Sequence, residues 1–256
     1  MPDRTRHAPG TPSWVDLQTS DQSGAKTFYT ALFGWEYDDQ PMDGGAVYSM
    51  AQKNGKHVAA IAPLPMPGVP PHWNTYVTVA DVDATAAQVP GAGGTTMGEP
   101  FDVMDAGRMA IASDPVGAMF CIWQPKNHIG ANIVNEHGAL CWNELMSTDV
   151  DAALPFYEKL FGWKRNRLPM ETMEYNELQL DGRGIAGAMK SPMEGMPSVW
   201  GVYFAVDDCD KAAEIAASEG GSVMQPPMDI PPGRMATIVD PAGAVFSVLK
   251  LTEPGD

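Results

Sequence analysis

The sequence predicts an α+β fold made of two tandem modules, each built from two β-α-β-β-β units. The first observation behind this prediction is an internal repeat, because the motif Phe-Tyr-x-x-Leu-Phe-Gly-Trp that ends at Trp35 ends again at Trp163, 128 residues later. The second is a Gly-Arg-Met-Ala motif with an Asp-Pro-x-Gly turn, which begins at Gly107 and again at Gly233, 126 residues later. Two landmarks with nearly equal offsets indicate homologous modules of about 110 residues, an ordinary domain length.

The repeat divides the 256 residues into five segments. We expect an N-terminal tail at 1–11, a first module at 12–124, a linker at 125–139, a second module at 140–251 and a C-terminal tail at 252–256.

The first unit contains the clearest helix. A strand is expected at 14–20, and Asp21 or Ser23 can cap the helix that follows, which runs to about Leu32. Gly34 is a typical helix stop. The helix carries an apolar stripe with helical spacing, formed by Phe28, Tyr29, Leu32 and Phe33.

The remaining elements follow the same order in every unit. Hairpin strands are expected at 46–52 and 57–62 around Asn54-Gly55. The second unit then gives a strand at 73–79, a helix at 82–89 and strands at 109–113 and 118–123, joined by a turn at Asp114-Pro115. The second module repeats this order at 142–147, 152–161, 174–180, 185–189, 202–206, 211–218, 236–239 and 245–249.

Composition narrows the class of partner and the compartment. The net charge of −16 argues against nucleic acid and against an anionic membrane, since both need a basic face. Three cysteines at positions that differ between the repeats suggest free thiols in a reducing cytoplasm. The first 13 residues are polar, and no segment approaches the ~20 apolar residues of a membrane span. A cytoplasmic protein is expected, with leaderless export left open.

The paired motifs resemble the vicinal-oxygen-chelate superfamily, which includes glyoxalases, bleomycin-resistance proteins and extradiol dioxygenases. The pattern of strand, acidic cap, helix and later Asp-Pro-x-Gly turn covers residues 12–251 and looks most like tandem actinobacterial proteins labelled glyoxalase-like or hydroxylase. The resemblance implies that each module forms a U-shaped mixed sheet with helices on its outer face and the site on its concave face. It also implies a monomer formed by pairing the two modules, or a weak homodimer.

The resemblance further implies a metal site whose ligand positions this sequence fills differently. Members of the family typically bind a divalent metal through His, Gln or Glu on three strands of a module. Counting from the helix caps and the Asp-Pro-x-Gly turns places these positions at Trp14, Asn74 and Cys121, and in the second module at Trp142, Gly201 and Ser247. Such ions need about three protein donors of nitrogen or oxygen. We therefore predict neither a bound metal nor another cofactor.

Strand alternation predicts what lies on each concave face instead. If Trp14 occupies a ligand position, the residues that share its face come from three strands. The predicted ligand-binding residues are Trp14, Gln18, Asn74, Cys121, Trp123, Trp142 and Met146. Trp123 has no tryptophan mate, because Leu249 takes its place in the second module, and is the candidate for module-specific binding. Aromatic walls of this kind suit planar, largely apolar small molecules.

One carboxyl group per module shares that face. Asp16 or Glu144 can act as a general base if burial raises its pKa, with Tyr76 or Tyr203 as the proton donor. Alternatively each carboxylate pairs with an arginine, Arg108 or Arg234, as a structural link.

Three functions stay open at this point. The first is a metal-independent protein that binds a small aromatic or hydrophobic organic molecule. The second is a lyase, isomerase or hydroxylase-type enzyme that uses the carboxyl groups and tyrosines. The third is a metal-dependent glyoxalase or dioxygenase with relocated ligands.

Overall fold

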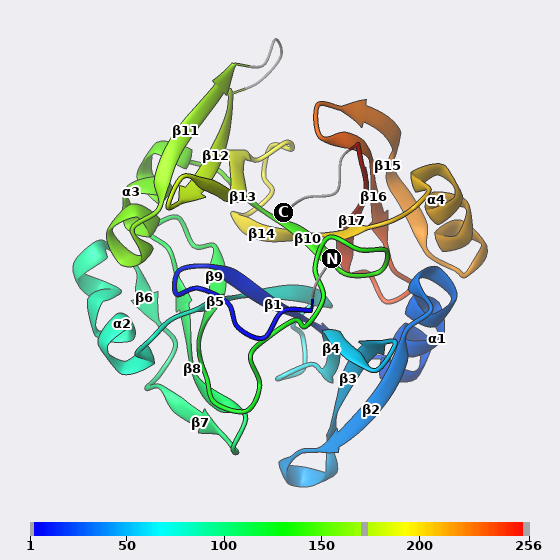
Figure 1. Ribbon diagram of the computed structural model, residues 1–256, viewed down its shortest axis with the longest axis horizontal. Coiled ribbons are helices and arrows are strands. Elements are labelled where there is room, and N and C mark those ends of the chain that lie inside the picture. Colours follow the sequence, from blue (N-terminus) through cyan, green and yellow to red (C-terminus); the bar gives the residue numbers. More distant parts are fainter. Residues whose placement is uncertain (1–2, 170–173, 253–256) are drawn as a thin grey trace.

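The structure is a computed structural model that describes residues 3–169 and 174–252. The predicted α+β fold of two tandem modules is confirmed. Each module forms one mixed sheet, and four α-helices accompany the sheets in the described residues (Figure 1). Among those residues, no helix combines the length and the apolar character needed to cross a bilayer.

The first module forms the sheet with strand order β2-β3-β4-β1-β5-β9-β8-β6, with β7 paired to β8. Its elements are β1 (Pro12–Thr19), α1 (Gln22–Phe33), β2 (Glu36–Pro41), η1 (Asp43–Gly45), β3 (Val47–Lys53), β4 (Lys56–Pro63), β5 (His72–Thr78), α2 (Val82–Gln88), η2 (Pro90–Ala92), β6 (Thr95–Thr96), β7 (Phe101–Val103), β8 (Gly107–Ser113) and β9 (Met119–Pro125).

The second module repeats the order as β11-β12-β13-β10-β14-β17-β16-β15. Its elements are β10 (Leu140–Ser147), α3 (Val150–Phe161), β11 (Lys164–Pro169), β12 (Glu174–Leu180), β13 (Arg183–Lys190), β14 (Val199–Ala205), α4 (Cys209–Ser218), β15 (Ser222–Ile230), β16 (Gly233–Val239) and β17 (Val245–Leu251).

The helices lie where the sequence predicts, although α3 and α4 each begin two residues earlier than expected. Asp21 caps α1 by accepting a 2.9 Å hydrogen bond from the Gly24 amide, and Gly34 ends the helix in the left-handed conformation with φ 71°. Asp149 and Gly162 repeat both features around α3. These caps satisfy backbone groups at both helix ends and so define where each helix begins and ends.

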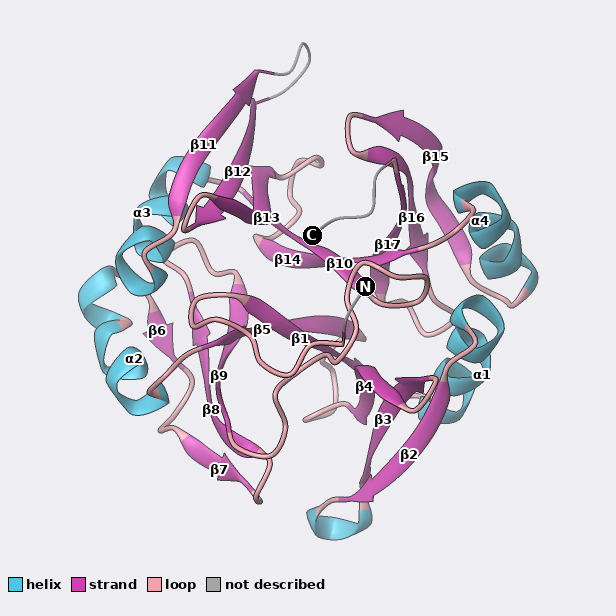
Figure 2. Cartoon of the chain, viewed as in Figure 1, coloured by secondary structure: helices cyan, strands magenta, loops and turns pink. Residues whose placement is uncertain are grey.

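The two sheets pack through their outer faces, and the helices lie at the two sides where the modules meet (Figure 2). One core joins Val15 and Leu17 of β1 to Phe204 of β14, with α1 beside α4. The other core joins α2 and the outer side of β9 to α3 and β13. The first unit of each module therefore packs against the second unit of the other, and the inner faces of both sheets point away from the junction.

Candidate functional site

The register of the central strands brings the predicted residues of the first module onto its concave face. Trp14 lies opposite Tyr76 on β5, and Tyr76 lies beside Cys121 on β9. Asp16 lies opposite Asn74. The same face also carries Gln18, which is half-buried, and Trp123, which is buried.

Asp16 lies at the centre of this face and is only 2% exposed. One carboxylate oxygen accepts hydrogen bonds from the hydroxyls of Tyr76 at 2.7 Å and Tyr48 at 3.0 Å. The other accepts from Asn74 Nδ2 at 2.9 Å. Trp14 Nε1 donates to the Tyr48 hydroxyl at 3.0 Å, so the indole holds the tyrosine in place. Burial raises the pKa of Asp16, while the three neutral donors act to lower it.

The expected pairing of these carboxylates with arginine is wrong. Arg108 binds Asp83 through Nε at 2.9 Å and lies 3.4 Å from Asp102. Arg234 binds Asp210 and Asp229 in the same way. Both arginines lie on the outer side of the sheet near the first turn of α2 or α4, where an exposed pair loses less hydration than a buried one.

Glu144 takes the place of Asp16 in the second module and is 4% exposed. Its Oε2 accepts a hydrogen bond from the Tyr175 hydroxyl at 3.3 Å, and Tyr175 in turn accepts from Trp142 Nε1 at 3.0 Å. Tyr203 lies opposite Trp142 and acts with Tyr175 to lower the pKa of Glu144. Burial outweighs both hydroxyls and raises this pKa to about 8, so the carboxyl group is protonated at neutral pH.

The two carboxyl groups differ in how fully their oxygens are bound. Glu144 Oε1 is buried and has no hydrogen-bond partner within the described part of the chain. In the first module Asn74 binds the second carboxylate oxygen of Asp16, and the repeat mate of Asn74 is Gly201. The terminal methyl group of Met146 lies beside Gly201, 2.9 Å from where a Cβ would be. The second module therefore has no asparagine donor at this position, and its unpaired Oε1 lies on the opposite side, beside Gly187 of β13.

The strand beside each acid, β4 or β13, carries a residue whose size matches the length of the acidic side chain. Asp16 pairs with Ala60 on β4, whereas Glu144 pairs with Gly187 on β13. A Cβ added to Gly187 would collide with Glu144 Oε1 and with the Tyr175 hydroxyl. Only glycine leaves room for the longer glutamate side chain.

Tyr48 and Tyr175 are the residues that the sequence analysis did not identify. Each hydroxyl links a tryptophan to the buried carboxyl group of its module. They lie 127 residues apart on corresponding strands, the same offset that separates Tyr76 from Tyr203. A repeat alignment extended over the third strand of each module is the signal that finds them.

The linker between the modules covers the concave face of the first one. Its His128 packs edge-on against Trp14 with 4.5 Å between ring centroids, and the His128 carbonyl accepts from Trp123 Nε1 at 3.0 Å. The Ala131 amide donates to the Ser13 carbonyl at 2.8 Å. Trp14, Cys121 and Trp123 are consequently buried beneath the chain itself.

The corresponding face of the second module is accessible. Trp142 and Tyr203 are half-buried, whereas their counterparts Trp14 and Tyr76 are buried. Met146 and Tyr175 are half-buried, as are Gln18 and Tyr48 in the first module. The two faces therefore share one design, a tryptophan, two tyrosines and an acid, and differ in access.

The positions of the family metal ligands lie on these faces but carry weak donors. Trp14, Asn74 and Cys121 lie together in the first module, and burial holds the pKa of the Cys121 thiol well above its usual range. Over the described ranges, 3–169 and 174–252, no group of three or more His, Cys, Asp or Glu side chains is arranged to hold a metal ion. The residues present do not fit the family metal.

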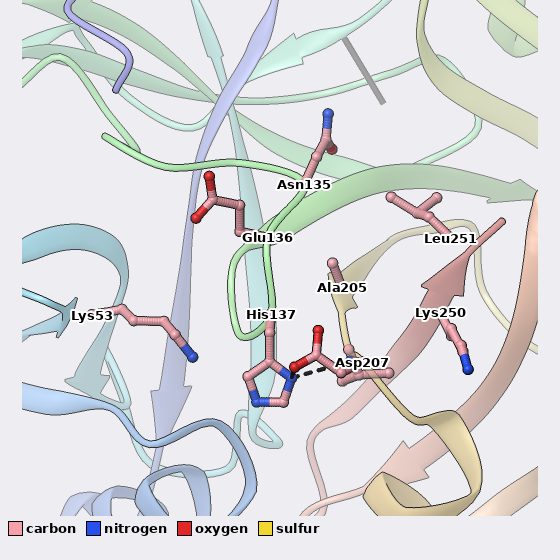
Figure 3. A pocket seen from close by; sticks show the side chains of 9 residues that line it. Lys53, Asn135, Glu136, His137, Ala205, Asp207, Lys250 and Leu251 are labelled. Carbon is pink, nitrogen blue, oxygen red and sulfur yellow. Dashed lines mark hydrogen bonds and ion pairs between the residues drawn. The ribbon is translucent and has the colours of Figure 1, made fainter. Parts of the chain in front are cut away.

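A cavity of about 540 Å³ lies apart from both faces, where the linker meets the ends of β3 and β17 (Figure 3). Lys53 and Lys250 line it together with Glu136 and Asp207, and His137 Nδ1 lies 3.5 Å from Asp207. Charges of both signs leave this cavity without a clear preference for a ligand charge. The concave face of the second module is the stronger candidate because it combines a buried, unpaired carboxyl oxygen, Glu144 Oε1, with half-buried aromatic side chains.

Comparisons with known proteins agree with this fold. The model of the Glyoxalase/Bleomycin resistance protein/Dioxygenase superfamily matches residues 11–122 and 137–248. A Mycobacterium bovis protein named "Putative glyoxylase CFP32" is 52% identical, and the alignment covers 98% of each chain. "Anthracycline biosynthesis protein DnrV" of Streptomyces peucetius is 35% identical, with 97% of this chain and 96% of that protein covered.

Solved structures with low sequence identity show the same architecture. The Mn(II)-bound glyoxalase from Novosphingobium aromaticivorans superimposes with a TM-score of 0.70 at 16% identity, over 97% of this chain and 84% of that one. The 2,3-dioxygenase LapB from Pseudomonas sp. KL28 gives 0.69 at 15% identity, over 98% and 96%. The resemblance stated from the motifs is confirmed: the chain belongs to the glyoxalase, bleomycin-resistance and dioxygenase superfamily.

Proposed function

We propose that the protein binds one small, planar, largely apolar organic molecule on the concave face of its second module, without a catalytic metal. The observation that carries the proposal is the free Oε1 of Glu144, buried within a face whose aromatic side chains are accessible. Natural proteins rarely leave a buried polar atom unpaired, because doing so costs about 1–3 kcal/mol. A bound ligand is a direct way to satisfy it.

The donor chemistry supports binding without a metal. An indole offers no lone pair to a cation, Gly201 offers no side chain, and a thiol held protonated by burial is a poor ligand. The aromatic residues Trp142, Tyr175 and Tyr203 offer stacking surfaces instead. Two relatives are named anthracycline biosynthesis proteins, which favours a polycyclic aromatic ligand.

Tryptophan fluorescence tests this proposal because the seven tryptophans differ in access. Trp142 is half-buried, and the other six are buried. Titration with an anthracycline should quench the emission of Trp142, and Trp142→Phe should abolish most of the quenching. Calorimetry should give one ligand per chain, and elemental analysis of protein purified without chelators should give no stoichiometric metal.

Two results contradict the proposal. Quenching that is unchanged in Trp142→Phe would place the ligand elsewhere. A stoichiometric metal that is lost together with binding would favour a metal-dependent glyoxalase or dioxygenase with relocated ligands.

A second candidate function is enzymatic, a metal-independent lyase, isomerase or hydroxylase-type activity. The raised pKa of Glu144, about 8, favours it, because a carboxyl group that is protonated at neutral pH can donate a proton to a bound substrate. Tyr175 and Tyr203 would orient this acid. Recovery of the ligand after incubation separates the candidates: an unchanged molecule supports binding alone, and turnover abolished by Glu144→Gln but not by Glu158→Gln supports catalysis.

A further inference from the structure

We infer that the ligand of the second module carries a carbonyl or quinone oxygen, which accepts a hydrogen bond from the carboxyl group of Glu144. The inference rests on the proposed function, since it assigns a chemical class to the molecule bound on that face.

The two modules differ in the donors that reach their buried carboxyl groups. Asp16 accepts two tyrosine hydroxyls on one oxygen and Asn74 on the other, so both of its oxygens are bound. Glu144 keeps the tyrosine side of this arrangement through Tyr175, but Gly201 takes the place of the asparagine. The unpaired Oε1 of Glu144 lies beside Gly187 on β13, and we assign the ligand acceptor to this oxygen.

The surroundings of Glu144 favour a protonated carboxyl group. A buried carboxylate needs a cation or several strong donors, and the groups that act on Glu144 are the two tyrosine hydroxyls. Oε2 already accepts from Tyr175, so the proton of a neutral carboxyl group belongs on Oε1. A raised pKa of about 8 agrees with a neutral group. The unpaired atom is then a donor, and its missing partner is an acceptor.

The residues around Glu144 indicate which kind of acceptor suits this face. Tyr175 and Glu177 of β12 and Tyr203 of β14 are its titratable neighbours, and Cys141 of β10 lies beside Tyr203. Glu177 lies across Gly187 from Glu144 and accepts hydrogen bonds from Gln179 at 2.6 Å and from Asn166. These neighbours are neutral or negative at neutral pH, so the face favours a neutral acceptor over an anionic atom at Oε1. A quinone or ketone on a planar ring system combines that acceptor with stacking surface.

Two probes of the same shape test the inference, anthraquinone-2-sulfonate and anthracene-2-sulfonate. They share a tricyclic frame and a sulfonate, and they differ in the carbonyl oxygens. Below neutral pH the wild-type protein should bind the quinone about tenfold more tightly than the hydrocarbon. The preference should disappear above about pH 8 to 9, as Glu144 ionises.

Variants of Glu144 and its neighbour give the controls. Glu144→Leu should remove the preference, and Glu144→Gln, which keeps a donor, should retain it and make it independent of pH. Gly201→Asn places an amide donor opposite Glu144, which should favour the ionised acid and move the loss of the quinone preference to lower pH. This variant keeps the test informative if Glu144→Leu does not fold. Glu158→Gln, on the exposed side of α3, should behave as the wild type.

The outcomes separate the inference from the proposed function. If both probes bind the wild type equally, or if quinone binding strengthens above pH 8 to 9, the assignment to Glu144 is overturned while the aromatic face remains. If neither probe binds, the proposed function falls, and the inference with it.

Discussion

Tyr29 in α1 of the first module donates a 3.1 Å hydrogen bond to Asp240 of the second. The repeat produces the same contact in reverse, from Tyr157 to Asp114, also at 3.1 Å. The other oxygen of Asp240 accepts backbone amides of its own Asp-Pro-x-Gly turn, including Ala242 at 2.9 Å. Two of the clearest repeated motifs, the helix and the turn, therefore meet across the module boundary, which gives both a structural role.

We predict that Tyr29→Phe lowers the free energy of unfolding by about 1–3 kcal/mol, because it leaves a buried carboxyl oxygen and the indole N–H of Trp73 without this hydroxyl. Tyr157→Phe should cost a similar amount, since its contacts repeat those of Tyr29. Urea unfolding followed by circular dichroism measures both. Tyr37→Phe is the control, because its hydroxyl binds a carbonyl within its own module at 3.3 Å. A Tyr29→Phe effect no larger than that control would contradict the role assigned to the cross-module bond.

Most of the fold is predictable from the sequence because repetition doubles every local signal. The helix α1 has its cap, its apolar stripe and its glycine stop in the sequence, and α3 has them again. The strands β2 and β11 were missed for a physical reason. Glu36–Pro41 and Lys164–Pro169 are polar edge strands with mostly exposed side chains, so they lack the alternation that marks a half-buried strand.

The sequence predicts which site residues share a face of the sheet, but it does not predict whether that face is covered. Alternation along β1 and β10 groups Trp14 with Asp16, and Trp142 with Glu144, on single faces. Nothing local reveals that the linker covers only the first of these faces, since that depends on tertiary packing of His128. The arginine pairing failed because Arg108 and Arg234 lie on the outer side of the sheet, where they bind Asp83 and Asp210.

Stability should depend on pH through Glu144. Its pKa is about 8 in the folded protein and near 4.5 in an unfolded chain, so the folded state holds an extra proton between these values. The free energy of unfolding therefore falls as pH rises through that window, by an amount on the order of a few kcal/mol. Glu144→Gln should remove this loss.

The measurement is the difference between the wild type and Glu144→Gln in urea unfolding, at about pH 5 and about pH 9. The free energy of unfolding of the variant should rise relative to that of the wild type as pH increases. Taking the difference between the two proteins removes the contribution of the other titrating groups. A difference that is the same at both pH values would show that Glu144 ionises normally in the folded protein.

The pairing of acid length with strand residue gives a double-mutant prediction. Gly187→Ala should displace Glu144 and Tyr175, with a cost of about 1–3 kcal/mol in stability. Adding Glu144→Asp recreates the pairing of Asp16 with Ala60 and should recover about 1 kcal/mol or more. Thermal unfolding of the four proteins of the cycle gives the coupling energy.

Gly184→Ala on the same strand is the control for this cycle, because its added methyl group meets only the end of the flexible Glu177 side chain. Simple additivity of Gly187→Ala and Glu144→Asp would rule out the steric account of why the two modules use different acids.

The cover over the first module depends on Gly130. Its φ is +100°, and a Cβ there would lie 2.5 Å from the Ser13 carbonyl oxygen, so Gly130→Ala should push the linker away from β1. Trp14 and Trp123 would then become accessible, and acrylamide should quench more of the fluorescence. Gly117→Ala is a matched control, because its φ of +98° brings the same backbone strain, about 1 kcal/mol, with no atom within 4 Å of the added methyl group. Backbone strain lowers the stability of both variants, but only Gly130→Ala adds a contact with Ser13. Equal acrylamide quenching in the two variants would mean that the linker does not control access to the concave face of the first module.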